Sequence, residues 1–362
     1  MSDFLEIVKA EAKSLLTLKK TERLWHVPLL ASLCVGLPLL VGYFTDRLDY
    51  GLLSCMAGLV ILYLPTTSVA RRMITLLSCS FGFMISFTIG VLFSFNPYIS
   101  ALVLGLFTVG VHWVVRYFDM KPPGSFFFVM IASIASCMPF DFDVVPLKVG
   151  LVGMGAMLAC LLALFYSIFI TKNRQFAKDE LILLKKNSTA AIFESLIIGT
   201  FIGLSLLTGK LLELTNPYWL PISCMAVLQG VSLQHVWSRS FQRILGTFIG
   251  LGLAWGLVSL HFDALGICLT IMILQFIIEM LVVRHYGLAV IFITPLTIFL
   301  AEAGGTALNH ANDLIETRFF DILIGSLIGA IAGYFLYHEK LRRTTERQIR
   351  KTKVSFWLKK RN

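Results

Sequence analysis

The chain alternates long apolar segments with short polar ones along nearly its whole length. A helix of about 20 apolar residues crosses the roughly 30 Å hydrocarbon layer of a bilayer and satisfies its own backbone hydrogen bonds there. The pattern predicts an all-α integral membrane protein with twelve transmembrane helices, at residues 27–44, 50–66, 72–94, 97–117, 124–140, 146–170, 190–212, 217–236, 241–261, 263–283, 286–303 and 317–338.

Composition agrees with this pattern. Hydrophobic residues make up 57% of the chain and charged residues 14%, and the mean hydropathy is +0.81. Soluble domains carry roughly 25% charged residues, so a soluble globular fold is excluded. The seven cysteines all lie in apolar segments, where they act as small packing residues. We find no motif for covalent catalysis or phosphate binding, and we therefore expect no enzyme activity, no cofactor and no metal.

The distribution of basic residues predicts the orientation. Of the 31 lysines and arginines, only Arg47, Lys148, Lys210 and Arg318 fall at the ends opposite to the two termini. Basic residues accumulate on the cytoplasmic side of membrane proteins. We therefore expect both termini in the cytoplasm of a multi-pass protein of the bacterial inner (plasma) membrane. The net charge of +10 then reflects topology and contact with anionic lipids, and no nucleic-acid partner is expected.

Short sequences recur in order between the two halves of the chain. The segment 36–42 (GLPLLVG) returns at 203–209 (GLSLLTG), and Ser-Cys-Met-Ala at 54–57 returns at 223–226. A nearly constant offset of this kind is typical of an internal repeat. Six helices per copy is an even number, so we predict two tandem six-helix repeats in the same orientation, related by an axis along the membrane normal.

The predicted domains follow from the repeat. Residues 27–170 form the first six-helix unit and residues 190–338 the second. Apolar and charged residues at helical spacing predict an amphipathic interfacial helix at 1–26. Residues 171–189 form a cytoplasmic linker, and residues 339–362 form a basic cytoplasmic tail.

Arginines at matching places in both copies are candidate substrate ligands. Arg116 matches Arg284, Arg71 matches Arg239, and Arg243 lies one turn after Arg239. A planar guanidinium binds a carboxylate in a bidentate manner, so these residues suit a cationic vestibule for an organic anion. The alternative is that they are ordinary basic anchors facing lipid headgroups.

Polar residues inside the fourth helix of each copy are candidates for proton coupling. Glu279 lies within the tenth predicted span with Gln275 one turn earlier, and His112 lies one turn before Arg116. Ionisable groups at bilayer depth are costly and mark functional pathways. A structural ion pair between Glu279 and Arg284 is the alternative.

The second half resembles a known family. Its Pro217–Ser223 segment contains Trp219, and Gln229, Arg239 and the sequence Gly-Thr-Phe-Ile-Gly at 246–250 follow. This pattern is similar to that of the FUSC family of fusaric acid resistance proteins and aromatic acid exporters, which are distantly related to plant aluminium-activated malate transporters. The first half matches less well.

The resemblance implies transport of compounds that carry a carboxylate, with Trp219 and Gln229 in the shared motif. Many bacterial members carry a large cytoplasmic domain between the membrane halves, for which the linker here is too short. Our leading hypothesis is a secondary transporter that exports an organic anion such as an aromatic acid, coupled to protons. A passive anion channel and a non-transporting membrane scaffold are the alternatives, and a homodimer is one expected assembly.

Overall fold

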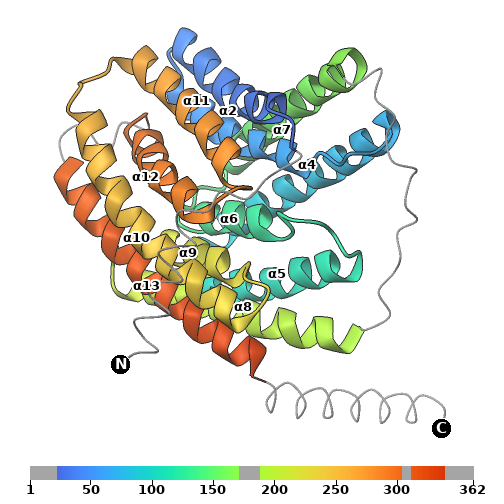
Figure 1. Cartoon of the computed structure of the whole chain (residues 1–362), viewed down its shortest axis with the longest axis vertical. Coiled ribbons are helices and arrows are strands. Elements are labelled where there is room, and N and C mark those ends of the chain that lie inside the picture. Colours follow the sequence, from blue (N-terminus) through green and yellow to red (C-terminus); the bar gives the residue numbers. More distant parts are fainter. Residues whose placement is uncertain (1–22, 171–187, 304–310, 339–362) are drawn as a thin grey trace. The chain divides into compact units, whose positions relative to one another are not determined.

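The computed structural model describes residues 23–170, 188–303 and 311–338 (Figure 1). Within these ranges every regular element is a helix. The predicted amphipathic helix at 1–26, the linker at 171–189 and the tail at 339–362 lie wholly or mostly outside them.

The first half contains α2 (His26–Phe44), α3 (Leu48–Gly58) with the 3₁₀ helix η1 (Leu59–Tyr63), α4 (Val69–Leu92), α5 (Pro97–Tyr117), α6 (Phe126–Ala135) and α7 (Val145–Phe165) with the π-helix η2 (Tyr166–Ile170). The second half contains α8 (Ser188–Leu211), α9 (Trp219–Leu228), α10 (Leu233–Val258), α11 (Ala264–Leu281), α12 (Tyr286–Ala303) and α13 (Ala311–Tyr337).

Eight of these helices are long and apolar enough to cross a bilayer, and four apolar helices are shorter. The short ones are Leu48–Tyr63, Phe126–Ala135, Trp219–Leu228 and Tyr286–Leu300. They occupy the second and fifth places in each half of the chain. The sequence located each apolar helix of the described residues, and the predicted span 286–303 has the bounds of α12. It overestimated the length of the spans at 124–140 and 217–236, because apolar residues continue into turns.

The clearest boundary error concerns the predicted span at 217–236. Helix α9 ends at Leu228, and α10 already begins at Leu233. Gly230 forms the turn between them, and a Cβ on it would lie 2.7 Å from the backbone nitrogen of Val236. Only a residue without a side chain fits this close approach. The predicted start of the next span at residue 241 is therefore wrong by two helical turns.

The helices form two compact units, and each unit takes helices from both halves of the chain. Unit 1 comprises residues 1–88, 141–179 and 238–323, and so holds α2, α3, α7, α11, α12 and most of α4 and α10. Unit 2 comprises residues 89–140, 180–237 and 324–362, and so holds α5, α6, α8, α9 and the second half of α13.

In unit 1, α2 packs beside α11 although the two helices are far apart in the sequence (Figure 1). The Ser32 hydroxyl donates a 2.6 Å hydrogen bond to the carbonyl of Met272. One turn later, the side chain of Met272 fills the space where a Cβ on Gly36 would lie. The apolar core around this crossing includes Leu39, Ile271 and Phe299. Small residues let the two helix backbones approach closely.

In unit 2, α5 packs against α8 in the same way. A Cβ on Gly105 would lie 2.9 Å from the carbonyl oxygen of Gly199, and one on Gly203 would lie 2.8 Å from the carbonyl oxygen of Ala101. Three glycines therefore form a crossing without side chains between the backbones. Buried residues of α5, α6, α8, α9 and α13 form the core of this unit around it.

Candidate functional site

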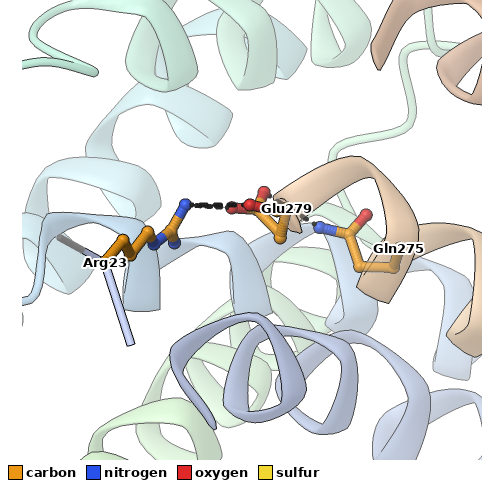
Figure 2. A network of polar contacts seen from close by, with 3 residues as sticks. All are labelled: Arg23, Gln275 and Glu279. Atoms are coloured by element: carbon orange, nitrogen blue, oxygen red, sulfur yellow. Dashed lines mark hydrogen bonds and ion pairs between the residues drawn. The ribbon is translucent and has the colours of Figure 1, made fainter. Parts of the chain in front are cut away.

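A buried carboxylate lies on the face of α11 within unit 1. The side chain of Glu279 is 5% exposed, and Arg23 Nη1 donates to its Oε2 at 2.9 Å. The same nitrogen donates to the Glu279 carbonyl oxygen at 3.3 Å. Gln275, one turn earlier on α11, donates from Nε2 to Oε1 at 3.3 Å (Figure 2). Both carboxylate oxygens therefore accept a hydrogen bond.

The partner of Glu279 differs from the one considered in the sequence. Arg284 follows the end of α11 and is half-buried, and its backbone nitrogen donates to the carbonyl of Leu281. The ion pair is made instead by Arg23, just before α2. Because α2 packs on α11, the start of α2 brings Arg23 to the end of α11. No local pattern could indicate a pair separated by 256 residues.

Two of the candidate arginines converge on one aromatic ring in unit 1. The guanidinium carbon of Arg239 lies 3.9 Å from the centroid of the Tyr286 ring. Arg243 is only 4% exposed, and its Nη1 donates to the Tyr286 hydroxyl at 3.0 Å. The arginines lie one turn apart on α10, so they share a face, while Tyr286 is the first residue of α12. Sequence reasoning did not identify Tyr286.

A further arginine of unit 1 binds the π-helix η2. Arg72 is buried, and its Nη1 donates to the Ser167 hydroxyl at 3.1 Å. The neighbouring Tyr166 hydroxyl lies 2.7 Å from Nδ1 of His26 on α2. Arg71, which the sequence singled out, precedes Arg72 at the start of α4 and is half-buried. Single π-helical turns inside α-helices are frequent at functional sites.

Unit 2 holds the remaining candidates in more exposed positions. Arg116, in the last turn of α5, donates to Glu194 Oε2 of α8 at 2.7 Å, with side chains 45% and 25% exposed. Nδ1 of His112 lies 3.0 Å from the Ser125 hydroxyl. Trp219 begins α9 and packs on Tyr218 with ring centroids 5.0 Å apart. Gln229 is the residue that follows α9 and is half-buried.

The predicted site residues thus fall into separate groups. Unit 1 brings Gln275 together with Glu279, and Arg239 together with Arg243. Arg71 and Arg284 also lie in unit 1 but in neither of these groups, and unit 2 holds Arg116, His112, Trp219 and Gln229. Among the residues that the structure describes, no three His, Cys, Asp or Glu side chains lie close enough to hold a metal ion. The arrangement offers cationic and hydrogen-bonding groups within apolar helices, which suits binding of a charged solute.

Comparison with known proteins shows which proteins the chain is similar to. Residues 202–332 match the family described as fusaric acid resistance protein-like. The uncharacterized membrane protein YvaC of Bacillus subtilis (strain 168) is 22% identical over 461 aligned positions, covering 86% of this chain and 73% of that protein. Since 461 positions exceed the 362 residues of this chain, the relative carries additional residues within the aligned region. No solved structure matches the chain. The chain is therefore a helical membrane protein whose second half is similar to the fusaric acid resistance protein-like family.

Proposed function

We propose that the chain is a secondary transporter that exports an organic anion, such as an aromatic carboxylic acid, in a proton-coupled manner. The observation that carries this proposal is the convergence of Arg239 and Arg243 on Tyr286 inside an apolar helical unit. Buried cations in membrane helices are rare, face protein or water-filled interiors, and mark solute pathways. A contact that only stabilises the fold would need one arginine at the Tyr286 ring, whereas two arginines meet there.

The chemistry of this cluster fits an anion with an aromatic ring. Arg243 offers a planar guanidinium that binds a carboxylate through two parallel hydrogen bonds. The ring of Tyr286 already accepts the guanidinium of Arg239 on its face, and an aromatic acid can compete for the same kind of contact. Arg71, Arg116 and Arg284 supply further positive charge that attracts anions towards the cytoplasmic side.

Proton coupling is assigned to Glu279 and His112, with Gln275 as a hydrogen-bonding partner. The Glu279 carboxylate accepts hydrogen bonds from the charged Arg23 and the neutral Gln275. Protonation removes the charge of the carboxylate and therefore weakens its hydrogen bond to the arginine. His112 contacts the Ser125 hydroxyl through Nδ1. Both residues lie on the helix that occupies the fourth place in its half of the chain.

The two-repeat architecture is part of the proposal, and the helix crossings support it. Adding 167 to residue numbers takes Gly36 to Gly203 and Gly105 to Met272, so the α2–α11 and α5–α8 contacts involve matching residues. The offset of 168 that matches Arg116 with Arg284 places Glu279 opposite Val111, the neighbour of His112. The short helices at the second and fifth places of each half support the same conclusion.

Contacts between the second and sixth helices of each half provide independent support. Ser54 of α3 lies against Gly155 of α7 in unit 1, and Ser223 of α9 lies against Gly325 of α13 in unit 2. The offsets are 169 and 170 residues. These contacts support the proposed arrangement of twelve membrane segments in two parallel repeats. Both termini are proposed to lie in the cytoplasm of a bacterial inner membrane because the basic residues accumulate on that side. Anionic lipids and a second copy of the chain are the expected partners.

The proposal is tested by measuring flux of radiolabelled benzoate in proteoliposomes that contain the full chain. Protein-dependent benzoate flux that changes with an imposed pH gradient is expected, and Arg243→Gln should abolish it. The matched control is Arg47→Gln, because Arg47 also donates to a tyrosine hydroxyl, that of Tyr50, but is exposed. Steady currents that reverse at the benzoate potential, without pH coupling, would instead establish a channel. A scaffold gives no flux in any variant.

A further inference from the structure

A buried carboxylate in unit 1 belongs to none of the groups described above. Asp321 of α13 is 1% exposed, and its Oδ1 has no hydrogen-bond partner among the residues that the structure describes. Arg318 lies one turn earlier on the same face of α13 and is also buried. A charged carboxylate in an apolar interior is costly unless it is paired, and otherwise it takes up a proton.

The guanidinium of Arg318 contacts a neutral acceptor. Its Nη2 donates to the Thr297 hydroxyl of α12 at 2.8 Å, and that hydroxyl donates to the carbonyl of Thr294 at 2.8 Å. A carboxylate is a much stronger acceptor for a guanidinium than a hydroxyl is. Asp321, one turn from Arg318 on α13, is therefore a stronger acceptor for a guanidinium than Thr297 when it is ionised and a weaker one when it is protonated.

The backbone beside this group is irregular. Pro295 of α12 has no N–H to donate to the carbonyl of Ile291. Gly250 of α10 lies against this carbonyl, since a Cβ there would be 2.6 Å from its oxygen and 2.8 Å from Thr294 Cβ. Leu251, Ala254, Ile298 and Phe319 pack together next to it, which joins α10, α12 and α13 (Figure 1). Pro295 thus leaves α12 without one helical hydrogen bond close to Thr297, the residue that Arg318 contacts.

The other charged residues of these three helices are few. In unit 1, α10 carries Arg239 and Arg243, both near its start beside Tyr286. Residues 287–300 of α12 include no titratable side chain. Three acidic residues, Glu302, Asp313 and Glu316, have side chains outside the described part of the chain. Arg318 is thus the charged group on the face of α13 that Asp321 shares.

We infer that Asp321 is a proton-binding site that controls whether Arg318 binds the transported anion. When Asp321 takes a proton from water onto a carboxylate oxygen, its charge disappears and Arg318 attracts the substrate carboxylate. When the proton returns to water, the Asp321 carboxylate competes for Arg318 and expels the substrate. This inference rests on the proposed transport of an organic anion.

This scheme determines whether the proton and the anion cross the membrane in the same direction or in opposite directions. Proton and anion bind together, so they cross the membrane in the same direction. Net flux then follows the sum of the two gradients, and export requires an outward anion gradient that exceeds the inward proton gradient. Exchange of the anion for a proton would need the opposite arrangement, in which protonation weakens anion binding.

The proton site is tested without transport, by infrared difference spectroscopy of the purified full chain during acidification. We expect a carboxylic acid C=O band in the wild type that is missing in Asp321→Asn and retained in Asp49→Asn. Asp49 is an exposed carboxylate of α3 and serves as the matched control. Identical spectra for the wild type and Asp321→Asn would overturn the proton site. A band that changes when sodium replaces choline would assign the site to a metal cation and overturn it too.

Anion coupling is tested by calorimetric titration with benzoate, and with benzenesulfonate because it stays ionised. Wild-type affinity should rise by up to about tenfold for each pH unit of acidification, the limit for one proton bound with each anion. Asp321→Asn should bind with the affinity that the wild type reaches in acid and should lose the Asp321 part of the pH dependence, leaving only the part due to Glu279 and His112. If Asp321→Asn does not fold, Asp321→Glu retains the carboxylate and should retain the pH dependence.

The outcomes separate this inference from the proposed function. Benzoate binding and flux whose pH dependence is the same in Asp321→Asn as in the wild type would overturn the inference while transport stands. Absence of binding of either probe to the folded wild type would overturn both anion coupling and the proposed function, whatever the infrared spectra show.

Discussion

Arg23 and Glu279 form a 2.9 Å ion pair across 256 residues of sequence. The pair joins the segment before α2 to α11, within the unit that combines both halves of the chain. Its two members differ in environment, since the Arg23 side chain is 22% exposed and that of Glu279 is 5% exposed. Loss of the ion pair therefore costs more free energy at the Glu279 carboxylate than at Arg23, because water can still solvate the arginine.

Removal of Arg23 should destabilise the chain more than neutralisation of Glu279. Arg23→Ala leaves a buried charge unpaired, and we expect a loss of about 2 kcal/mol, below the ~3–5 kcal/mol of a fully buried pair because Arg23 is partly hydrated. Glu279→Gln keeps the shape and removes the charge, so it should cost less. Thermal unfolding in detergent measures both.

The double variant makes this prediction specific. Arg23→Ala in the Glu279→Gln background should have little further effect, because no buried charge remains to be paired. Arg116→Ala is the matched control for an exposed pair with Glu194, and its cost should stay below about 1 kcal/mol. Equal losses for Arg23→Ala in both backgrounds would contradict the ion-pair argument.

The hydroxyl of Tyr286 should matter for stability as well as flux. Tyr286→Phe removes the acceptor of the buried Arg243 but keeps the ring beneath Arg239, and hydrogen bonds to charged groups contribute about 1.5–3 kcal/mol. Tyr50→Phe removes the same kind of contact from Arg47 at an exposed site, so its melting temperature should barely change. A comparable shift in both variants would contradict the role of burial.

The glycine crossing between α5 and α8 should not tolerate a methyl group. A Cβ at Gly105 would lie 2.9 Å from the carbonyl oxygen of Gly199, and the backbone must shift to admit it. We expect Gly105→Ala to lower stability by about 1–3 kcal/mol. Gly110→Ala, on the same helix with open space around it, should be neutral or stabilising. Unfolding in detergent distinguishes the two.

The predicted orientation can be tested by labelling of introduced cysteines. A membrane-impermeant maleimide added to intact cells should label Asp49→Cys and Asp141→Cys but not Lys121→Cys or Val231→Cys. All four positions are exposed. The wild type is the control, because six of its seven free cysteines are buried and the seventh, Cys137, is half-buried. Labelling of the second pair from outside would reverse the topology.

The sequence predicted the existence of every helix because hydropathy depends on composition along one segment. It predicted some helix ends wrongly, such as that of α9 at Leu228, because a turn at Gly230 interrupts the helix while the residues remain apolar. Contacts between residues that lie far apart in the sequence could not be predicted. The contact of Arg243 with Tyr286, and that of Glu279 with Arg23, depend on which helices pack together, and a single sequence contains no direct signal for this.

The mixed membership of unit 1 has a consequence for synthesis in the membrane. Helix α2 emerges early from the ribosome, whereas α11, which covers its Ser32 and Gly36 face, is made only after residue 264. The same holds for Arg23, because its carboxylate partner Glu279 belongs to the same late helix. Until most of the chain has been translated, the α2 face that carries Ser32 and Gly36 therefore contacts lipid or the insertion machinery instead of α11.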